Sequence, residues 1–140
     1  MAFSLYCLVV DEKSEIDLKL LEKQLRFCFS KTQDFQLIYE DHPFNSHVKN
    51  LLLTLGEWWI RVHYEAGELV KDDSIEIAKY AKPDLIESIS SIDRRVRVRF
   101  ASDEDKSHTT QIMLMIEFLE SKKDFVIFDP QRKKLLVEGF

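Results

Sequence analysis

Residues 50–66, NLLLTLGEWWIRVHYEA, contain the pattern on which the predicted fold depends. Apolar side chains alternate with other side chains on both sides of Gly56-Glu57, as expected for two strands that each bury one face. A glycine-containing break between two such runs is typical of a β-hairpin. Trp58 and Trp59 are neighbours in the sequence, so they must point to opposite faces of the sheet. One face is therefore predicted to be apolar, and the other carries a tryptophan among charged residues.

Two other segments are predicted to lie in the same sheet. Residues 3–10 are apolar on both faces, which is typical of an interior strand. Residues 93–100, DRRVRVRF, alternate apolar side chains with arginines, which indicates one apolar face and one basic face. Shorter strands are expected at residues 35–40, 124–129 and 135–137.

Apolar residues recur at helical spacing in two segments, which predicts helices over residues 14–29 and 108–122. Asp73 and Glu76 have the spacing of a capping box, so a third helix is expected over residues 72–81, followed by a short helical segment. The resulting order is β-α-β-β-β-α-(α)-β-α-β-β. Helices separated by one to three strands favour an α+β fold with a mixed or antiparallel sheet and helices packed mainly on one face.

The composition fits one globular domain spanning residues 1–140, with 45% hydrophobic and 32% charged residues. The formal net charge of −5 argues against a dedicated nucleic-acid binder and suits a basic partner. No run approaches the roughly 18 apolar residues of a membrane span. The apolar start of the chain lacks the basic residues of a signal peptide. We therefore expect a cytoplasmic protein with no membrane contact.

The usual catalytic motifs are missing from the sequence. Four scattered histidines form no HExxH motif, no serine lies in a GxSxG elbow, and three isolated glycines cannot build a phosphate loop. Cys7 and Cys28 lie on apolar stripes, where a free thiol behaves as a small hydrophobic side chain. The acids at 103–105 precede His108 but lack the glycine and terminal glutamate of a calcium loop, so we interpret them as a solvated turn before a helix. We expect no enzymatic activity, no metal and no cofactor.

One face of the predicted sheet has the composition of a binding surface. If Trp58 and Val96 point inward, the opposite face carries side chains of the types that are enriched at binding hot spots. The predicted partner-binding residues are Trp59, Arg61, His63, Arg95, Arg97 and Arg99, with the acidic turn Asp103, Glu104 and Asp105. Two alternatives remain open: the arginines pair with Glu40 and Glu65 on a solvated face, or the short helix covers Trp59.

Three segments of the chain share features with a known group of proteins. They are GEWWIRVHYEAGELVKDDSIEIAKYA (56–81), DRRVRVRFASDEDKSHTTQIMLMIEFLES (93–121) and FVIFDPQRKKLL (125–136). The Trp-x-Ile-Arg-x-x-Tyr-Glu strand, the Arg-Arg strand before an acidic turn and the closing Phe-Asp-Pro-Gln turn resemble small bacterial proteins of polymorphic or secreted toxin systems, several of which act as immunity proteins. The usual glycine after Asp-Pro-Gln is replaced here by Arg132-Lys133. The toxin contacts of such proteins vary with the partner.

This resemblance implies a cytoplasmic immunity-type protein that binds a cognate toxin or effector protein and neutralises it by occluding its active site or substrate path. One alternative is another protein-binding or nucleic-acid-binding scaffold module, although the negative charge does not favour nucleic acid. A further alternative is a small enzyme with an unrecognised site around His63 or Asp103. Self-association to a homodimer is left open.

Overall fold

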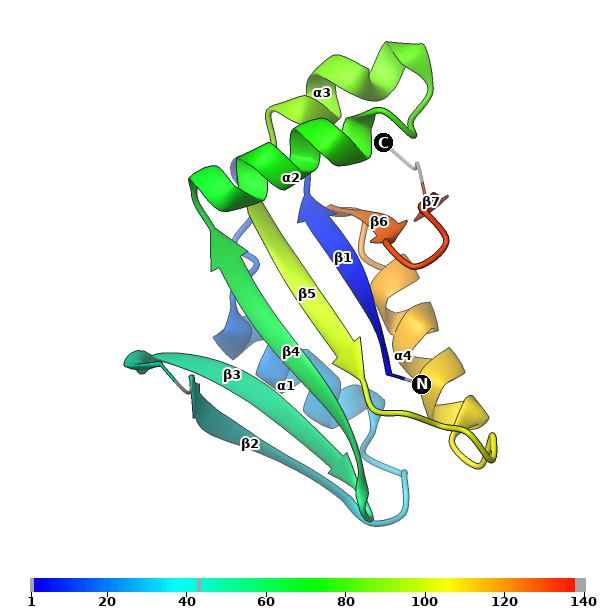
Figure 1. Cartoon of the computed structure of the whole chain (residues 1–140). Coiled ribbons are helices and arrows are strands. Elements are labelled where there is room, and N and C mark those ends of the chain that lie inside the picture. Colours follow the sequence, from blue (N-terminus) through cyan, green and yellow to red (C-terminus); the bar gives the residue numbers. More distant parts are fainter. Residues whose placement is uncertain (1, 43, 138–140) are drawn as a thin grey trace.

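The structure is a computed structural model that describes residues 2–42 and 44–137 (Figure 1). In chain order its elements are β1 (Phe3–Val9), α1 (Leu18–Cys28), β2 (Phe35–His42), β3 (Asn45–Leu55), β4 (Trp58–Ala66), α2 (Glu68–Ala78), the 3-10 helix η1 (Pro83–Leu85), α3 (Ile86–Ser90), β5 (Arg94–Phe100), α4 (Thr109–Glu120), β6 (Phe125–Asp129) and β7 (Lys134–Val137). This order of strands and helices is the one that the sequence predicts.

The seven strands form one sheet in the order β2-β3-β4-β5-β1-β6-β7, and each neighbouring pair is antiparallel. The predicted α+β fold is thereby confirmed. The expected hairpin joins β3 to β4 through a two-residue loop, with Leu55 opposite Trp58. Gly56 opens this loop with a φ of +69°, a left-handed conformation that glycine adopts at little cost and that tight hairpin turns require.

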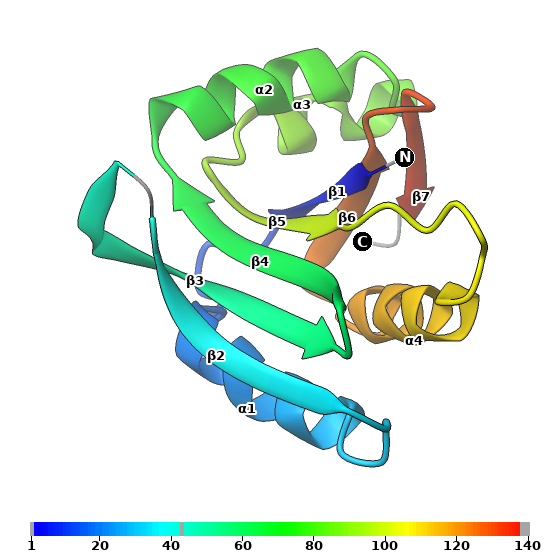
Figure 2. The same cartoon turned by 60° about the horizontal axis from the view of Figure 1, so that its bottom comes forward.

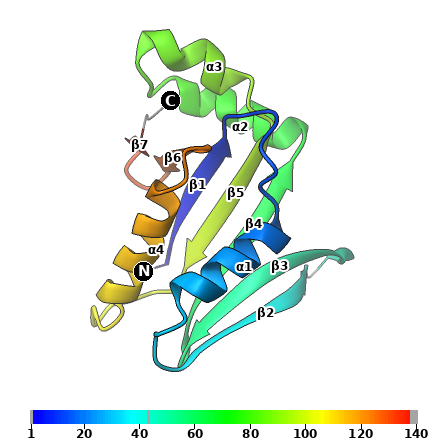
Figure 3. The same cartoon turned by 180° about the vertical axis from the view of Figure 1, so that it is seen from behind.

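The inner face of the sheet packs against α1 and α4, which both lie on the side seen in Figure 3. Trp58, Ile60 and Val62 of β4 are buried on this face, as their alternation predicts. The largest fully buried side chains of this core are Leu5, Leu21, Leu25, Phe29, Leu51, Leu53, Ile60, Phe100, Met115 and Phe125. Cys7 is buried here as expected, and Cys28 is half-buried at the edge.

The outer face of the sheet is covered at one end only, by α2 and α3 (Figure 2). A second, smaller core lies between these helices and the strands: Leu8, Ile77, Ala78, Ile89, Ile92, Val126, Phe128 and Leu135. The sheet thus has α1 and α4 on one side and α2 and α3 on the other, and no helix of the described residues lies above the remaining part of its outer face.

Helix α2 begins four residues earlier than the sequence predicts. Gly67 stands at its N-cap position, and Asp73 therefore lies inside the helix, where it cannot act in a capping box. Its carboxylate is engaged by Arg95 of β5, and the Ser74 hydroxyl donates to the Val70 carbonyl. The capping-box prediction was wrong because a long-range ion pair uses the carboxylate that the local pattern assigned to the helix start. No helix within the described ranges is both long and apolar enough to span a membrane.

Candidate functional site

The antiparallel register of β4 and β5 brings the predicted side chains together on the outer face. Three cross-strand pairs form its rows: Arg61 with Arg99, His63 with Arg97, and Glu65 with Arg95. Directly opposed side chains on one face of a sheet have Cβ atoms about 5 Å apart, so each pair is in mutual reach. Five of the predicted residues and Glu65 therefore form one continuous strip along the two strands, and Trp59 extends it along β4.

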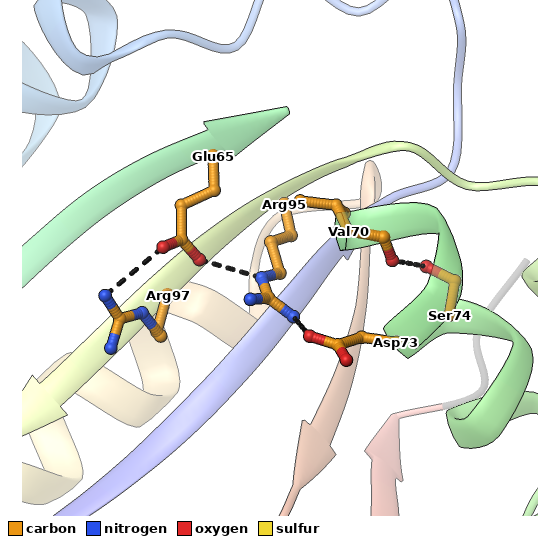
Figure 4. Close-up of polar contacts among 6 residues, drawn as sticks. All are labelled: Glu65, Val70, Asp73, Ser74, Arg95 and Arg97. Atoms are coloured by element: carbon orange, nitrogen blue, oxygen red, sulfur yellow. Dashed lines mark hydrogen bonds and ion pairs between the residues drawn. The ribbon is translucent and has the colours of Figure 1, made fainter. Parts of the chain in front are cut away.

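Arg95 lies at the end of this strip that α2 covers. Its Nε donates to Glu65 Oε1 at 2.8 Å, and its Nη1 donates to Asp73 Oδ2 of α2 at 2.7 Å (Figure 4). The guanidinium lies over the Tyr6 ring, 4.5 Å from its centroid. Burial would lower the pKa of Arg95, but the hydrogen bonds to Asp73 and Glu65 outweigh it and raise the pKa above its usual value. With 8% of its surface exposed, Arg95 fastens α2 to the sheet, and we do not include it in the surface available to a partner.

Trp59 lies at the opposite, uncovered end of the strip. The Arg61 guanidinium stacks 4.3 Å from the centroid of its ring, and that of Arg99 lies 6.0 Å away. Arg61 Nε also donates to Glu40 Oε1 of β2 at 2.7 Å. Neither α2 nor α3 packs on Trp59, which remains half-buried, so the alternative in which the short helix covers this tryptophan is wrong.

His63 and Arg97 occupy the middle of the strip, between its covered and uncovered ends. Arg97 Nη2 lies 3.2 Å from Glu65 Oε2, so Arg97 shares a carboxylate with Arg95. Its Nε is buried and has no hydrogen-bond partner among the described residues, and the same is true of His63 Nε2. His63 is 7% exposed, and its burial, followed by the charge of Arg97, lowers the pKa of its ring from 6.5 to about 4. The imidazole is therefore neutral at pH 7.

The arginines of the strip differ in how their charge is balanced. Glutamates pair with Arg61, Arg95 and Arg97, which confirms the expected pairing with Glu40 and Glu65. Arg99 is the exception, because it forms no ion pair with any carboxylate in the described part of the chain. The strip thus combines a structural ion-pair network at one end with an uncompensated cation at the other.

The acidic turn is built from its own hydrogen bonds. Asp103 accepts from the backbone N–H of His108 with both carboxylate oxygens, at 3.1 Å, and Asp105 accepts from the N–H and hydroxyl of Ser107. The hydrogen bonds from Ser107 lower the pKa of Asp105. Glu104 is exposed. The structure does not pair Asp103, Glu104 or Asp105 with the arginines of the strip in any ion pair between described residues.

The turn instead closes over the inner-face tryptophan. The His108 ring stacks on Trp58 with centroids 4.7 Å apart, and Trp58 Nε1 donates to the carbonyls of Ala101 and Ser102. The turn therefore joins β5 to α4 and leads away from the outer face. Within the described ranges, no group of three or more His, Cys, Asp or Glu side chains is arranged to hold a metal ion.

Two contributors to the strip were missed in the sequence. Tyr6 of β1 lies beneath Arg95, and Asp73 reaches it from α2. Alternation within residues 3–10 places Tyr6 on one face, but only the strand order shows that β1 adjoins β5. No local signal indicates Asp73, because its partner is 22 residues away.

A separate apolar groove runs between α1 and α4, with a volume of about 680 Å³. Its walls include Leu20, Leu114 and Phe118, and Phe27 at its rim is 84% exposed. The groove is lined by neither His63 nor Asp103, the two residues around which an enzymatic site was considered. It lies on the far side of the sheet from Trp59.

No protein-family model, curated protein or solved structure matches this chain. The geometry of its own residues is therefore the basis for a functional proposal.

Proposed function

We propose that this protein is an immunity-type protein that binds a cognate toxin or effector protein through the uncovered end of its outer face and neutralises it by occlusion. The observation that supports this most directly is the cluster of Trp59, Arg61 and Arg99, which lies on two interior strands and is covered by no helix of the described chain. Tryptophan and arginine contribute the largest share of binding energy in many protein interfaces. The sequence resemblance to immunity proteins points to the same kind of partner.

The cluster is already ordered before any partner arrives. Arg61 is held between the Trp59 ring and the Glu40 carboxylate, so little side-chain freedom is left to lose on binding. The strands beneath it pair along five register positions between β3 and β4 and seven between β4 and β5. A surface of this rigidity suits a protein that covers another protein and carries out no reaction of its own.

The first experiment identifies the toxin and tests protection. Proteins recovered in stoichiometric amounts with the tagged protein from its native cell are expressed in a heterologous host, with and without it. Trp59→Ala is expected to weaken toxin binding about 30-fold or more, as removal of a hot-spot side chain does, and to reduce protection accordingly. Trp59→Ala loses the packing of a half-buried ring on the core and its stack with Arg61, but it should remain folded at the assay temperature, which thermal denaturation checks.

Phe27→Ala is the control, since it also removes an aromatic ring, here an exposed one from α1 on the other side of the sheet. This variant should protect as the wild type does. Equal killing with and without the wild-type protein, for every toxin that co-purifies, would refute the proposed function.

Single-stranded nucleic acid is the second candidate partner, because Trp59 between two arginines also resembles a base-stacking platform. Recovery of RNA in the pull-down, with affinity that falls steeply as salt rises, would favour it. The net charge of −5 opposes this reading.

A further inference from the structure

We infer that the Arg97–Arg99 segment of the outer face is a carboxylate-binding site that takes an acidic side chain from the partner protein. This inference rests on the proposed function for the identity of the partner, and it adds the chemistry that the contact requires. The three observations behind it are the charge balance of the strip, the unmet hydrogen bonds in its middle and the spacing of the two arginines.

The arginines of the strip outnumber the carboxylates that pair with them by one. The four guanidinium groups of the strip face three carboxylates, those of Glu40, Glu65 and Asp73. Arg99 is the guanidinium that has no carboxylate partner within the described ranges, and it lies directly opposite Arg61 across the two strands. Like charges in directly opposed positions destabilise a sheet, so a bound anion at Arg99 would relieve this repulsion.

The hydrogen bonds of the middle row are also incomplete. Arg97 Nε and His63 Nε2 are buried and have no partner among the described residues, although buried polar atoms in folded proteins are nearly always paired. Among the described residues, Arg97 forms its one ion pair with Glu65, at 3.2 Å, and Glu65 also pairs with Arg95. The Arg97 side chain can therefore turn toward a new acceptor without losing an exclusive partner, and this movement would bring its Nε–H to the ligand.

The spacing of Arg97 and Arg99 suits one small anion. They are two residues apart on β5, so both side chains leave the same face of the strand about 7 Å apart. A carboxylate has two oxygens that can accept from two guanidinium groups at once. The Trp59 ring beside Arg99 offers a flat apolar surface for the methylene groups of an aspartate or glutamate.

The surroundings favour a single carboxylate over the repeated phosphates of a nucleic acid. Glu40 and Glu65 flank the site on both sides, and the whole chain carries a net charge of −5. The further negative charges of a polyanion would be repelled by these carboxylates, whereas one acidic side chain brings a single negative charge, which Arg99 balances. The negative total charge can still attract a basic toxin from a distance, since long-range steering and short-range contacts are set by different residues.

The test uses the purified full-length protein and a probe that carries one side-chain carboxylate, N-acetylglutamate amide. NMR follows the Nε–H signals of Arg97 and Arg99 and the ring signals of His63 during titration. The expected result is a saturable shift of these signals in the millimolar range, together with a rise in the pKa of His63, whose ring faces Arg97, Arg99, Glu40 and Glu65. N-acetylglutamine amide, which has the same shape without the charge, should produce no saturable shift.

Two variants show whether the site or the general positive charge is responsible. Arg99→Gln should weaken binding of N-acetylglutamate amide about tenfold, as expected for loss of a charged hydrogen-bond donor. Arg132→Gln, which removes an equally positive and more exposed side chain elsewhere, should leave it unchanged. Absence of a saturable shift in the wild type, or equal weakening in both variants, would overturn the inference.

A third titration separates the two classes of partner. The ligand is a ten-residue oligothymidylate. If it shifts the same signals with a lower dissociation constant than N-acetylglutamate amide, the site binds nucleic acid and the carboxylate inference is rejected. This test is independent of toxin protection. Carboxylate binding without protection would reject the proposed function alone, and Trp59-dependent protection without carboxylate binding would reject this inference alone.

Discussion

The two ends of the outer face use the same residue type for different purposes. Arg95 and Arg99 leave the same face of the same strand, four positions apart. Arg95 is buried beneath α2 and donates to two carboxylates, whereas Arg99 pairs with no carboxylate of residues 2–42 or 44–137. What differs is the covering element: α2 brings Asp73 to Arg95, whereas no described residue brings a carboxylate to Arg99. An arginine on a sheet is therefore structural or available according to what packs above it, and the strand sequence does not distinguish the two.

The largest expected effect is the loss of stability in acid that the buried His63 ring causes in the middle of the strip. The pKa of His63 is lowered to about 4 in the folded protein, against 6.5 for an exposed ring. Below pH 6.5 the His63 ring is protonated in the unfolded chain but remains neutral in the folded chain. The free energy of unfolding should therefore be highest above pH 6.5 and fall as the pH drops toward 4. The loss amounts to about 3 kcal/mol. Urea unfolding of the wild type and His63→Gln across this range measures it.

His63→Gln has no ring to titrate, so this variant should not show the part of the loss of unfolding free energy in acid that comes from His63. The difference between the two proteins should therefore change steadily between pH 6.5 and 4 and be constant above that window. A difference that stays the same from pH 7 to pH 4 would mean that His63 titrates normally and that the middle of the strip is open to water.

The next effect concerns the covered end. Arg95→Ala leaves the Glu65 and Asp73 carboxylates without their shared donor and removes the stack on Tyr6. We expect a loss of about 2 kcal/mol of unfolding free energy at pH 7, below the full cost of a broken buried ion pair because Asp73 remains half exposed. Urea unfolding provides the measurement. A loss below 0.5 kcal/mol, the ordinary range for a surface substitution, would remove the contrast between the two ends.

A smaller effect is expected at Glu65, which pairs with Arg95 at the covered end and with Arg97 in the middle of the strip. Burial alone would raise the pKa of Glu65, but the hydrogen bond from Arg95 and the charges of Arg97 and Arg95 lower it overall. Its ion pairs therefore stabilise the fold above pH 4.5 and are lost as the pH falls through the lower folded-state pKa. Glu65→Gln should cost about 1 kcal/mol at pH 7, and less as the pH falls below 4.5. Chemical unfolding of both proteins at pH 7 and pH 3 tests this, and a gap that widens in acid would contradict it.

The smallest effect on stability is expected at the uncovered end. Arg99→Gln removes a side chain without an ion-pair partner in the described part of the chain, so the free energy of unfolding should change by about 0.5 kcal/mol or less. Removal of the repulsion with Arg61 offsets part of the loss. The same denaturation assay at low salt provides the comparison with Arg95→Ala. Equal losses in the two variants would show that the two ends are energetically alike.

The sequence predicted most of the fold because the alternation of apolar and polar residues shows which face of each strand is buried. The alternation through Trp58 and Trp59, and through Val96 and Val98, placed the tryptophans and arginines on the correct sides. Element order followed from the same patterns. The start of α2 was mistaken because the pattern around Asp73 also fits a helix cap, and local spacing contains no information about a partner on a distant strand.

The sequence predicted which β4 and β5 side chains share the outer face, but it did not predict which of them are buried, shared or unpaired. Alternation assigns Arg95, Arg97 and Arg99 equally to the outer face. Only the packing of α2 shows that the first is buried, the second shared and the third unpaired. The acidic turn was placed with them by proximity in sequence, yet the stack of His108 on Trp58 directs it to the other side of the strands.

The two cysteines make this molecule convenient to observe. Burial raises the pKa of both thiols, but Cys7 lies fully enclosed in the core whereas Cys28 lines the accessible groove beside α4. A maleimide dye should therefore attach to Cys28 in the native state and leave Cys7 untouched until the chain unfolds. A fluorophore at Cys28 would sit across the sheet from Trp59 and report complex formation without blocking the contact. The labelling rate of Cys7 would in turn report how often the whole core opens.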